Sequence, residues 1–365
     1  MNQRPLHLVI KQEAMTSAYR LYNLGLFNTV STKGHSSILQ ILHKVVPLSL
    51  APSDLFIKTT SILKSFKISL LLRHEWDGVW PFTRPPDCIT FYLNHIKSDQ
   101  FVGVGICCDD LNLENSISLG YLATEFQAVI FGIMSCLSIC LEQNFENRTV
   151  YICTANKAVL QTLKNFVVKT RLVHDCLCLL NLLGQTNTVQ LFWTPAHCGI
   201  HEFDHANVLA KLASLQAPIG AEPLLPLSGQ IIKDEIYDFI LKQHCDYWNS
   251  QTSCTNSRLL IKKPLTEDHN WIVNLSRLQQ RKLLGAITGH CTLKDHLFNI
   301  GLSSDRLCRF CLNDVESTYH IICLCSHFEG HRRHIFRKDY INIDEYAELK
   351  VKDIKDFFNA CKLDI

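Results

Sequence analysis

Four residues near the carboxyl-terminal end of the chain have the types and the spacing of a metal site. A Cys-x2-Cys-x8-His-x4-Cys pattern is formed by Cys308, Cys311, His320 and Cys325. Three thiolates and one imidazole are the ligand set of a closed, tetrahedral structural Zn²⁺ site, and the close Cys pair is typical of a zinc knuckle. We therefore expect these residues to bind a structural zinc ion.

Other residues of the same segment leave alternatives open. Cys323 and His327 are competing ligands for such an ion. A second interpretation is a small apolar cluster of free cysteines. The chain has 17 cysteines, an odd number without a framework spacing. In a reducing compartment, most of them are expected to be small buried hydrophobic residues.

A second region, residues 87–217, has hydrophobic patterns that change between those of strands and helices. Period-two runs predict strands at 90–93, 102–107, 116–119, 149–153 and 189–193. Helical spacing predicts helices at 124–143, capped by Thr124, and at 157–166, 172–183 and 202–215. The order βββαβααβα combines a meander with crossover units. We expect an α/β fold with a mixed five-stranded sheet and flanking helices.

The end of this region resembles the closing motif of ribonuclease H. Residues Trp193 to His197 and Ala206 to Ala210 stand where that family has a Trp-x-Pro-Gly-His turn and an Ala-Asp-x-Leu-Ala helix. Upstream, Phe126 to Val129 resembles the family's Phe-Gln-Ala-Glu helix, and Tyr151 to Ala158 its Tyr-Ser-Asp-Ser-x-Ala strand end. The resemblance implies a ribonuclease H-like fold.

The resemblance places the family's four catalytic carboxylates on residues without charge, which are Asn94, Val129, Ala155 and Asn207. His95 also stands where the family prefers Gly. Phosphodiester cleavage in this family uses two divalent ions, which carboxylates hold and neutralise. Because Mg²⁺ needs negatively charged oxygen ligands to compete with solvent, the Mg²⁺ site expected for the family is lost here. No catalytic residue of the family pattern is intact.

Two neighbouring carboxylates are candidate substitutes. Glu125 lies one helical turn before Val129, and Asp204 lies three residues before Asn207, so both are placed to share a face with the lost site. The alternative is that both lie in first helical turns because the helix dipole favours negative charge there.

The two flanking regions resemble the segments that precede and follow the ribonuclease H in a group of polyproteins. Runs at 287–311, 5–14 and 34–39 resemble sequences around the ribonuclease H of insect-type non-LTR retrotransposon polyproteins of the jockey group. The resemblance covers nearly the whole chain, which lacks a reverse-transcriptase active-site sequence.

Composition changes predict five segments. These are an N-terminal connection segment at 1–86, with helices at 13–24 and 38–46; the ribonuclease H-like domain at 87–217; a linker and helix at 218–255, with its helix at 230–249; a helical region with the Cys/His motif at 256–340, with a helix at 270–287; and a C-terminal tail at 341–365.

Charge is uneven along the chain although the net charge is only +2. Residues 1–86 carry ten Lys/Arg against four Asp/Glu, residues 87–217 seven against eleven, and residues 256–340 thirteen against eight. A surface for RNA, DNA or RNA–DNA hybrid is therefore expected in the flanks. The alternative is ordinary solvated surface.

Hydropathy and targeting signals limit the cellular compartments in which the protein is expected. The mean hydropathy is +0.05, and we find no run of eighteen uncharged apolar residues, which argues against a membrane partner. We also find no secretory leader and no cluster of five or more Lys/Arg. An intracellular protein, of nucleus or cytoplasm, is expected.

Three functions follow from these observations. The first is a catalytically degenerate, retrotransposon-derived ribonuclease H-like protein that binds nucleic acid. The second is an active RNA–DNA hybrid ribonuclease, and the third is a protein-interaction module that uses the exposed face of the helix at 202–215. Fold alone does not decide between them.

Overall fold

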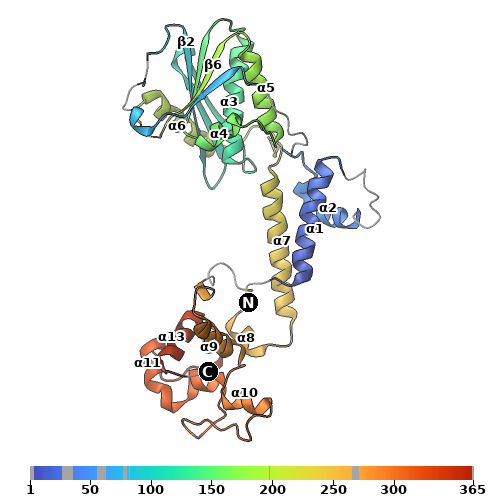
Figure 1. Cartoon of the computed structure of the whole chain (residues 1–365), viewed down its shortest axis with the longest axis vertical. Coiled ribbons are helices and arrows are strands. Elements are labelled where there is room, and N and C mark those ends of the chain that lie inside the picture. Colours follow the sequence, from blue (N-terminus) through green and yellow to red (C-terminus); the bar gives the residue numbers. More distant parts are fainter. Residues whose placement is uncertain are drawn as a thin grey trace. The chain divides into compact units, whose positions relative to one another are not determined.

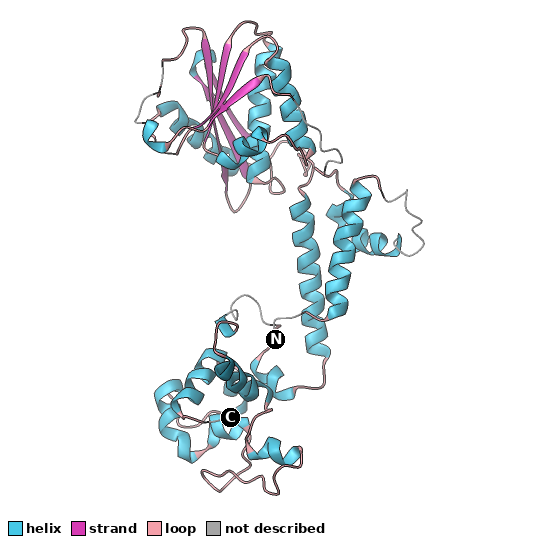
Figure 2. Cartoon of the chain, viewed as in Figure 1, coloured by secondary structure: helices cyan, strands magenta, loops and turns pink. Residues whose placement is uncertain are grey.

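The computed structural model describes residues 4–26, 36–55, 63–76, 80–81, 83–196, 198–264 and 271–363 (Figures 1 and 2). The chain divides into two compact units. One unit is Lys11–Phe239, and the other combines Met1–Ile10 with Ile240–Ile365. We call them the sheet unit and the helical unit.

The sheet unit is built on a six-stranded mixed sheet with the order β1-β6-β5-β2-β3-β4. Its strands are β1 (Phe66–Ser69), β2 (Cys88–Lys97), β3 (Val102–Cys108), β4 (Leu113–Ser118), β5 (Thr149–Thr154) and β6 (Thr188–Trp193). The strands β2, β3 and β4 form an antiparallel meander, whereas β5 is parallel to both β2 and β6. The α/β fold and the five strands predicted from period-two runs are confirmed.

The predicted number of strands was wrong by one. The additional strand, β1, lies in the connection segment and pairs in parallel with β6, Phe66 beside Val189 and Ser69 beside Phe192. A four-residue run carries little local signal, and a parallel partner more than 100 residues away leaves no mark on its pattern. This run becomes a strand because the unpaired backbone groups at the edge of β6 are available for hydrogen bonding.

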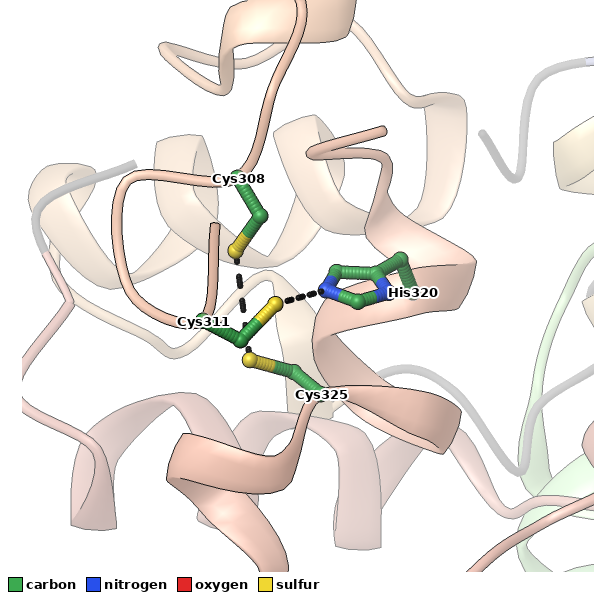
Figure 3. A group of neighbouring side chains, drawn as sticks. All are labelled: Cys308, Cys311, His320 and Cys325. Atoms are coloured by element: carbon green, nitrogen blue, oxygen red, sulfur yellow. Dashed lines mark hydrogen bonds between the residues drawn. The ribbon is translucent and has the colours of Figure 1, made fainter. Parts of the chain in front are cut away.

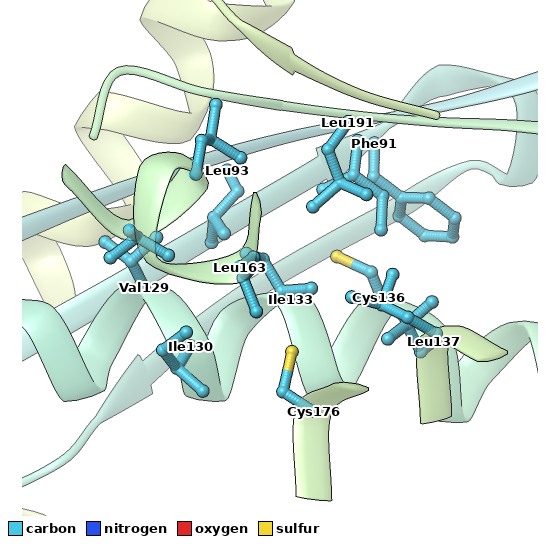
Figure 4. Packing of buried hydrophobic residues seen from close by; sticks show 14 of the residues in the cluster. Phe91, Leu93, Val129, Ile130, Ile133, Cys136, Leu137, Leu163, Cys176 and Leu191 are labelled. Carbon is cyan, nitrogen blue, oxygen red and sulfur yellow. The ribbon is translucent and has the colours of Figure 1, made fainter. Parts of the chain in front are cut away.

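Helices cover the two faces of the sheet, with α3 (Glu125–Glu142), α4 (Lys157–Lys164) and α5 (Arg171–Leu183) on one face and α6 (His201–Ser214) on the other. The sheet unit also contains α2 (Ser36–Val45), and α1 (Leu6–Asn23) and α7 (Gly229–Ser250) belong partly to each unit. Successive strand residues point to opposite faces. In β2, Phe91 and Leu93 pack with α3, α4 and α5 in the largest core cluster (Figure 4), whereas Tyr92 packs in a second cluster with α6.

The start of α3 has the cap that the sequence predicted. The Thr124 hydroxyl accepts a hydrogen bond from the Gln127 N–H at 3.2 Å, and the Gln127 side chain accepts one from the Thr124 N–H at 3.2 Å. This capping box satisfies two N–H groups that a helix start leaves free. Among the described residues α3 is also the one helix long and apolar enough to cross a membrane. Here its apolar side chains pack against the sheet.

The helix α6 lies against β3 at backbone distance. A Cβ atom added at Gly105 would lie 2.0 Å from the Ala206 carbonyl oxygen, and one added at Gly103 would lie 2.3 Å from that of Ala210. Only glycine leaves room for this approach. The alternating glycines of β3 therefore set how closely α6 packs on the sheet.

The connection segment is attached to the sheet unit through Asp54. Its carboxylate accepts a hydrogen bond from the Leu172 N–H at 2.8 Å, at the start of α5, and one from the Gln127 side chain at 3.4 Å. Its backbone exchanges further bonds with Arg171 and Leu227. Because this carboxylate is buried, its pKa is raised to about 6.

The helical unit has its own core. Its helices are α8 (Thr255–Leu260), α9 (Arg277–Thr288), α10 (Lys294–Asn299), α11 (Glu329–Phe336), α12 (Ile343–Tyr346) and α13 (Val351–Ala360). Tyr346, Ile354 and Phe357 of the expected C-terminal tail are fully buried in this core together with Ile321. The tail is thus packed into the same core as the Cys/His motif.

Most predicted helix positions are confirmed, and two boundaries were wrong. The helix predicted at 13–24 begins at Leu6, because the apolar spacing continues upstream as far as this residue, directly after Pro5. The helix predicted at 270–287 begins at Arg277, where the Ser276 hydroxyl accepts a hydrogen bond from the Gln279 N–H. Asn270 itself lies outside the described residues.

Candidate functional site

The four residues of the Cys/His motif come together in the helical unit. The ligand atoms of Cys308, Cys311, His320 and Cys325 all lie within 4.8 Å of one another. The Sγ atoms of Cys308 and Cys325 are 3.9 Å apart, and Cys311 Sγ is 3.3 Å from His320 Nε2 (Figure 3). Three of the residues are buried and Cys311 is half-buried. The cluster could hold a metal ion such as zinc.

These separations fit a tetrahedral ion. Zn–S bonds of about 2.3 Å and Zn–N bonds of about 2.0–2.1 Å place two sulfurs of a tetrahedron about 3.8 Å apart, and a sulfur and a nitrogen about 3.6 Å apart. The two distances of 3.9 and 3.3 Å lie close to these edges. The types of the donor atoms and the distances between them therefore both fit a tetrahedral Zn²⁺ site.

Local backbone structure positions the first two cysteines. The N–H of Cys308 donates to the Asp314 carbonyl at 2.7 Å, and the Cys308 carbonyl accepts from the Leu312 N–H at 2.9 Å. Leu312 has a φ of 58°, in the left-handed region, which closes the loop. Leu307 and Val315 form an antiparallel bridge at its base. The result is a tight knuckle with both sulfurs on one side.

A short π-helix positions the other two ligands. It covers His320–Leu324, and the Cys325 N–H donates back to the His320 carbonyl at 2.8 Å. The wider turn of a π-helix brings residues five apart onto one side. This explains how His320 and Cys325 face the same point.

Asp314 lies beside the second ring nitrogen of the histidine. His320 Nε2 faces Cys311, and its Nδ1 lies 3.4 Å from the Asp314 carboxylate. A carboxylate on the second ring nitrogen is the usual partner of a metal-binding histidine, because it fixes the tautomer and raises ligand basicity. Burial lowers the pKa of His320, whereas Asp314 raises it. The spacing pattern did not identify Asp314 as part of the site.

Burial also acts on the thiols. It raises the pKa of Cys308, and it raises the pKa of Cys325 to about 12. For Cys311 burial acts in the same direction, but hydrogen bonds from backbone N–H groups, that of Asn313 first, leave its pKa lowered. A metal ion must displace protons from such thiols, so binding will release protons.

The two competing ligands are not part of the cluster. Cys323 is fully buried in the apolar core. His327 packs on Phe310, with ring centroids 5.4 Å apart. The apolar-cluster interpretation describes Cys323 and many other buried cysteines, such as Cys136 and Cys176 of the sheet unit. It does not explain the convergence of three sulfurs and an imidazole.

Close to the knuckle, an ion pair between a buried carboxylate and a half-exposed arginine links two loops. The Glu316 side chain is fully buried and lies 2.6 Å from Arg309 Nη2. It also accepts the N–H groups of Lys294 at 3.0 Å and of Arg309 at 2.8 Å. Burial raises the pKa of Glu316, but these bonds outweigh it and leave the pKa lowered. A cavity of about 400 Å³ beside it is lined by His290, His296 and other polar residues.

In the sheet unit, two of the four family positions lie at neighbouring strands of the sheet, Asn94 within β2 and Ala155 directly after β5. Asn94 and Ala155 come directly after Leu93 of β2 and Thr154 of β5, which are paired. Asn94 is buried, and its Oδ1 accepts the His95 N–H at 2.9 Å. Ala155 packs against the cluster that includes Trp76 and Phe203, and its carbonyl accepts the Trp193 Nε1–H. The structure thus brings these positions together, without charge.

The other two positions lie on helices. Val129 of α3 is completely buried in the main core cluster, close to Ile130 and Ile133 in Figure 4. Asn207 of α6 is half-buried. An apolar, dry position at Val129 offers no oxygen to an ion. The residues present do not fit a site for two Mg²⁺ ions.

The candidate substitutes are exposed. Glu125 lies in the first turn of α3 and Asp204 in that of α6. Glu125 acts electrostatically on the half-buried His95, whose pKa burial lowers and Glu125 raises. The Nδ1 atom of His95 has no hydrogen-bond partner among the described residues. His197 of the closing turn lies outside the described residues.

Neither a protein-family model nor a curated protein matches this sequence.

Proposed function

We propose that this chain is a catalytically degenerate ribonuclease H-like protein, derived from a non-LTR retrotransposon, that binds nucleic acid and carries a structural zinc ion. The antiparallel meander of β2, β3 and β4, continued by the parallel strands β5 and β6 and with α3 and α6 on opposite faces, has the architecture expected from the order βββαβααβα. This agreement supports the family resemblance carried by the motifs at Phe126 and Trp193.

The observation that carries the loss of catalysis is the buried valine in α3. The family pattern requires a carboxylate there, but Val129 has no exposed surface and packs in the apolar core. A group of metal ligands acts together, so its loss costs orders of magnitude in rate. Asn94 and Asn207 offer only neutral oxygens. The scaffold is thus retained without its two-metal chemistry.

Nucleic acid binding is assigned to the helical unit. Several of its cations are neutralised by ion pairs, such as Arg309 with Glu316 and Lys294 with Asp305. By contrast, Arg277 and Arg281 lie one turn apart and exposed on α9. Two guanidinium groups at this spacing are suited to neighbouring phosphates of RNA, DNA or a hybrid.

Zinc would have a structural role. Bound to the four ligands, it would connect the knuckle at 308–311 with the π-helix that leads into the core of the helical unit. A closed site with no open position supplies folding free energy rather than catalysis.

Binding is tested with a labelled RNA–DNA hybrid, using fluorescence anisotropy at several salt concentrations. We expect the double variant Arg277→Gln/Arg281→Gln to weaken binding and to reduce the salt slope by about two. The matched control is Lys350→Gln/Lys352→Gln, which removes the same charge from exposed positions elsewhere in the unit. Equal effects of both variants would contradict a site on α9.

Cleavage is tested with the same hybrid in Mg²⁺ and Mn²⁺. We expect no cleavage by the natural chain. Activity that is lost on Glu125→Gln or Asp204→Asn would instead show an active hybrid ribonuclease with substitute ligands. The restored variant carries Asn94→Asp, Ala155→Asp and Asn207→Asp, with and without Val129→Glu. Its stability must be measured first, because a glutamate at 129 enters a dry core.

A role in protein interaction is the second candidate function. The observation that favours it is a row of exposed apolar side chains formed by Val208 and Leu212 of α6 and by Leu215, which directly follows the helix. Absence of hybrid, RNA and DNA binding even at low salt would favour this function over the first.

A further inference from the structure

The positive charge of residues 87–217 is concentrated in one stretch. Five of their seven Lys/Arg lie between Glu146 and Asp175, where the sequence has no acidic residue. Three of the five are exposed in the loop between α4 and α5 or at its two ends, and these are Lys164, Lys169 and Arg171. We call residues 164–171 the basic loop. Although residues 87–217 are acidic as a whole, this loop attracts anions.

A fourth cation comes from the connection segment. The Nζ atom of Lys64 donates to the Asn165 carbonyl at 3.0 Å and also to the Lys164 carbonyl. It lies 4.5 Å from the centre of the Phe166 ring. These three contacts hold the ammonium group of Lys64 on the basic loop. Burial first, and then the charge of Lys164, lower the pKa of Lys64, as expected where cations gather.

Carboxylates do not neutralise these four cations. Within the part of the chain that the structure describes, none of the four forms an ion pair with Asp or Glu. Arg148, which precedes the loop in the same basic stretch, does pair with Asp87 at 3.4 Å. The next acidic residue along the chain, Asp175, has its carboxylate 3.3 Å from His174. The charge of the basic loop is therefore available to a ligand.

An exposed aromatic ring lies among these charges. Phe166 is 66% exposed, whereas Val168 is buried and anchors the loop on the core. A ring beside several cations suits an unpaired nucleic-acid base, because the ring stacks on the base while the cations contact the phosphates. In a duplex the bases stack on one another, so a side chain reaches their faces only in a single strand.

We propose that the basic loop, together with Lys64, is a binding site for single-stranded RNA or DNA, with one base stacked on Phe166 and the neighbouring phosphates on the four cations. This inference rests on the proposed nucleic-acid function and adds a second site to the one on α9. The α9 site offers charge alone, whereas the basic loop requires an unpaired base. An acidic peptide would be attracted by the same charge, but it has no base to stack on the ring.

The experiment uses the full chain and labelled single strands of about 12 nucleotides, one of RNA and one of DNA. Binding is measured by fluorescence anisotropy at several salt concentrations, beside the RNA–DNA hybrid. The charge variant is Lys164→Gln/Lys169→Gln. Its matched control is Lys97→Gln/Lys211→Gln, which removes the same charge from exposed positions of the same unit.

A second pair of variants tests the ring. The ring variant is Phe166→Ala, and its matched control is Tyr121→Ala, which removes another exposed aromatic side chain of the sheet unit. Both pairs are also measured in the background Arg277→Gln/Arg281→Gln, which removes the proposed site on α9.

We expect Phe166→Ala to weaken single-strand binding by about 5- to 100-fold, the usual effect of losing one stacked base, with an unchanged salt slope. Binding of the hybrid should not change in this variant. Lys164→Gln/Lys169→Gln should weaken single-strand binding and reduce the salt slope by about 1.4. Both controls should bind like the natural chain, and the effects should persist in the α9 background.

Three results would overturn the inference. If Phe166→Ala and the natural chain bind single strands equally well, no base stacks on the ring, and hybrid binding that depends on α9 still stands. If the charge variant and its control weaken binding equally, the cations act only through the net charge of the chain. If the natural chain binds neither single strands nor hybrid even at low salt, the proposed nucleic-acid function fails and this inference fails with it.

Discussion

The closest packing in the sheet unit lies between α6 and β3, and it can be tested with one methyl group. In Gly105→Ala the new Cβ would lie 2.0 Å from the Ala206 oxygen and 2.4 Å from the Ala210 nitrogen. Ordinary contacts between such atoms are about 3.5 Å. Both atoms belong to the backbone of one helix, so no side chain can rotate away. The helix must retreat as a whole by about 1 Å or more.

This movement of α6 determines how much free energy of unfolding the substitution removes. Overpacking a core costs about 1–3 kcal/mol, and here it also loosens the packing of Phe203 and Leu209 on the sheet. Replacing glycine by alanine in a strand also stabilises the fold by about 0.5–1 kcal/mol, because the unfolded chain has less conformational entropy to lose. We expect a net loss of about 2 kcal/mol in the free energy of unfolding, or roughly 5 °C in Tm for a unit of this size.

Thermal unfolding and hydrogen exchange of the β2 and β3 amides provide the assay. The control is Gly229→Ala, whose Cβ would meet the Leu55 side chain at an ordinary 3.6 Å, with an expected change of at most about 0.5 kcal/mol. Gly132→Ala should lie between them, because its closest contact, at 2.3 Å, is a movable Leu93 methyl. Equal stability of the Gly105 and Gly229 variants would refute the reasoning.

Three further predictions concern buried charge and metal. The pKa of Asp54 is raised from 3.8 to about 6 in the folded chain, so the free energy of unfolding of the sheet unit should fall by at most about 3 kcal/mol as pH rises from 4 to 6. In urea unfolding, Asp54→Asn should remove this dependence on pH. Arg309→Met should lower the free energy of unfolding by about 3–5 kcal/mol, because it leaves the fully buried Glu316 carboxylate without its cation. Glu316→Gln should lower it by only about 1–3 kcal/mol, because Arg309 can then turn to solvent. Equal unfolding midpoints of the two variants would contradict this. A strong chelator, or Cys325→Ser, should speed hydrogen exchange at 306–328 and leave the sheet unchanged, whereas Cys178→Ser on the exposed face of α5 should change neither region.

Local patterns were enough to predict most of the elements. The period-two runs of β2 and β3 and the helical spacing after Thr124 depend on neighbours within a few residues, and the structure confirms them. The four zinc-ligand candidates were also predictable, because a knuckle and a following turn are local structures with a fixed spacing. The uncharged residues at the family's carboxylate positions could likewise be read directly from the sequence.

Interactions between distant segments were decided only by the tertiary structure. β1 is a strand because β6 has a free edge with which it can pair. Asp54 is buried and accepts or donates several hydrogen bonds because three segments far apart in sequence come together around it. Likewise, nothing in the spacing of the Cys/His motif marks Asp314 as a neighbour of His320. The sequence determined which side chains could do chemistry. Burial and long-range packing decided which of them are dry, paired or left without a partner, since these properties belong to the folded surroundings and not to the local chain.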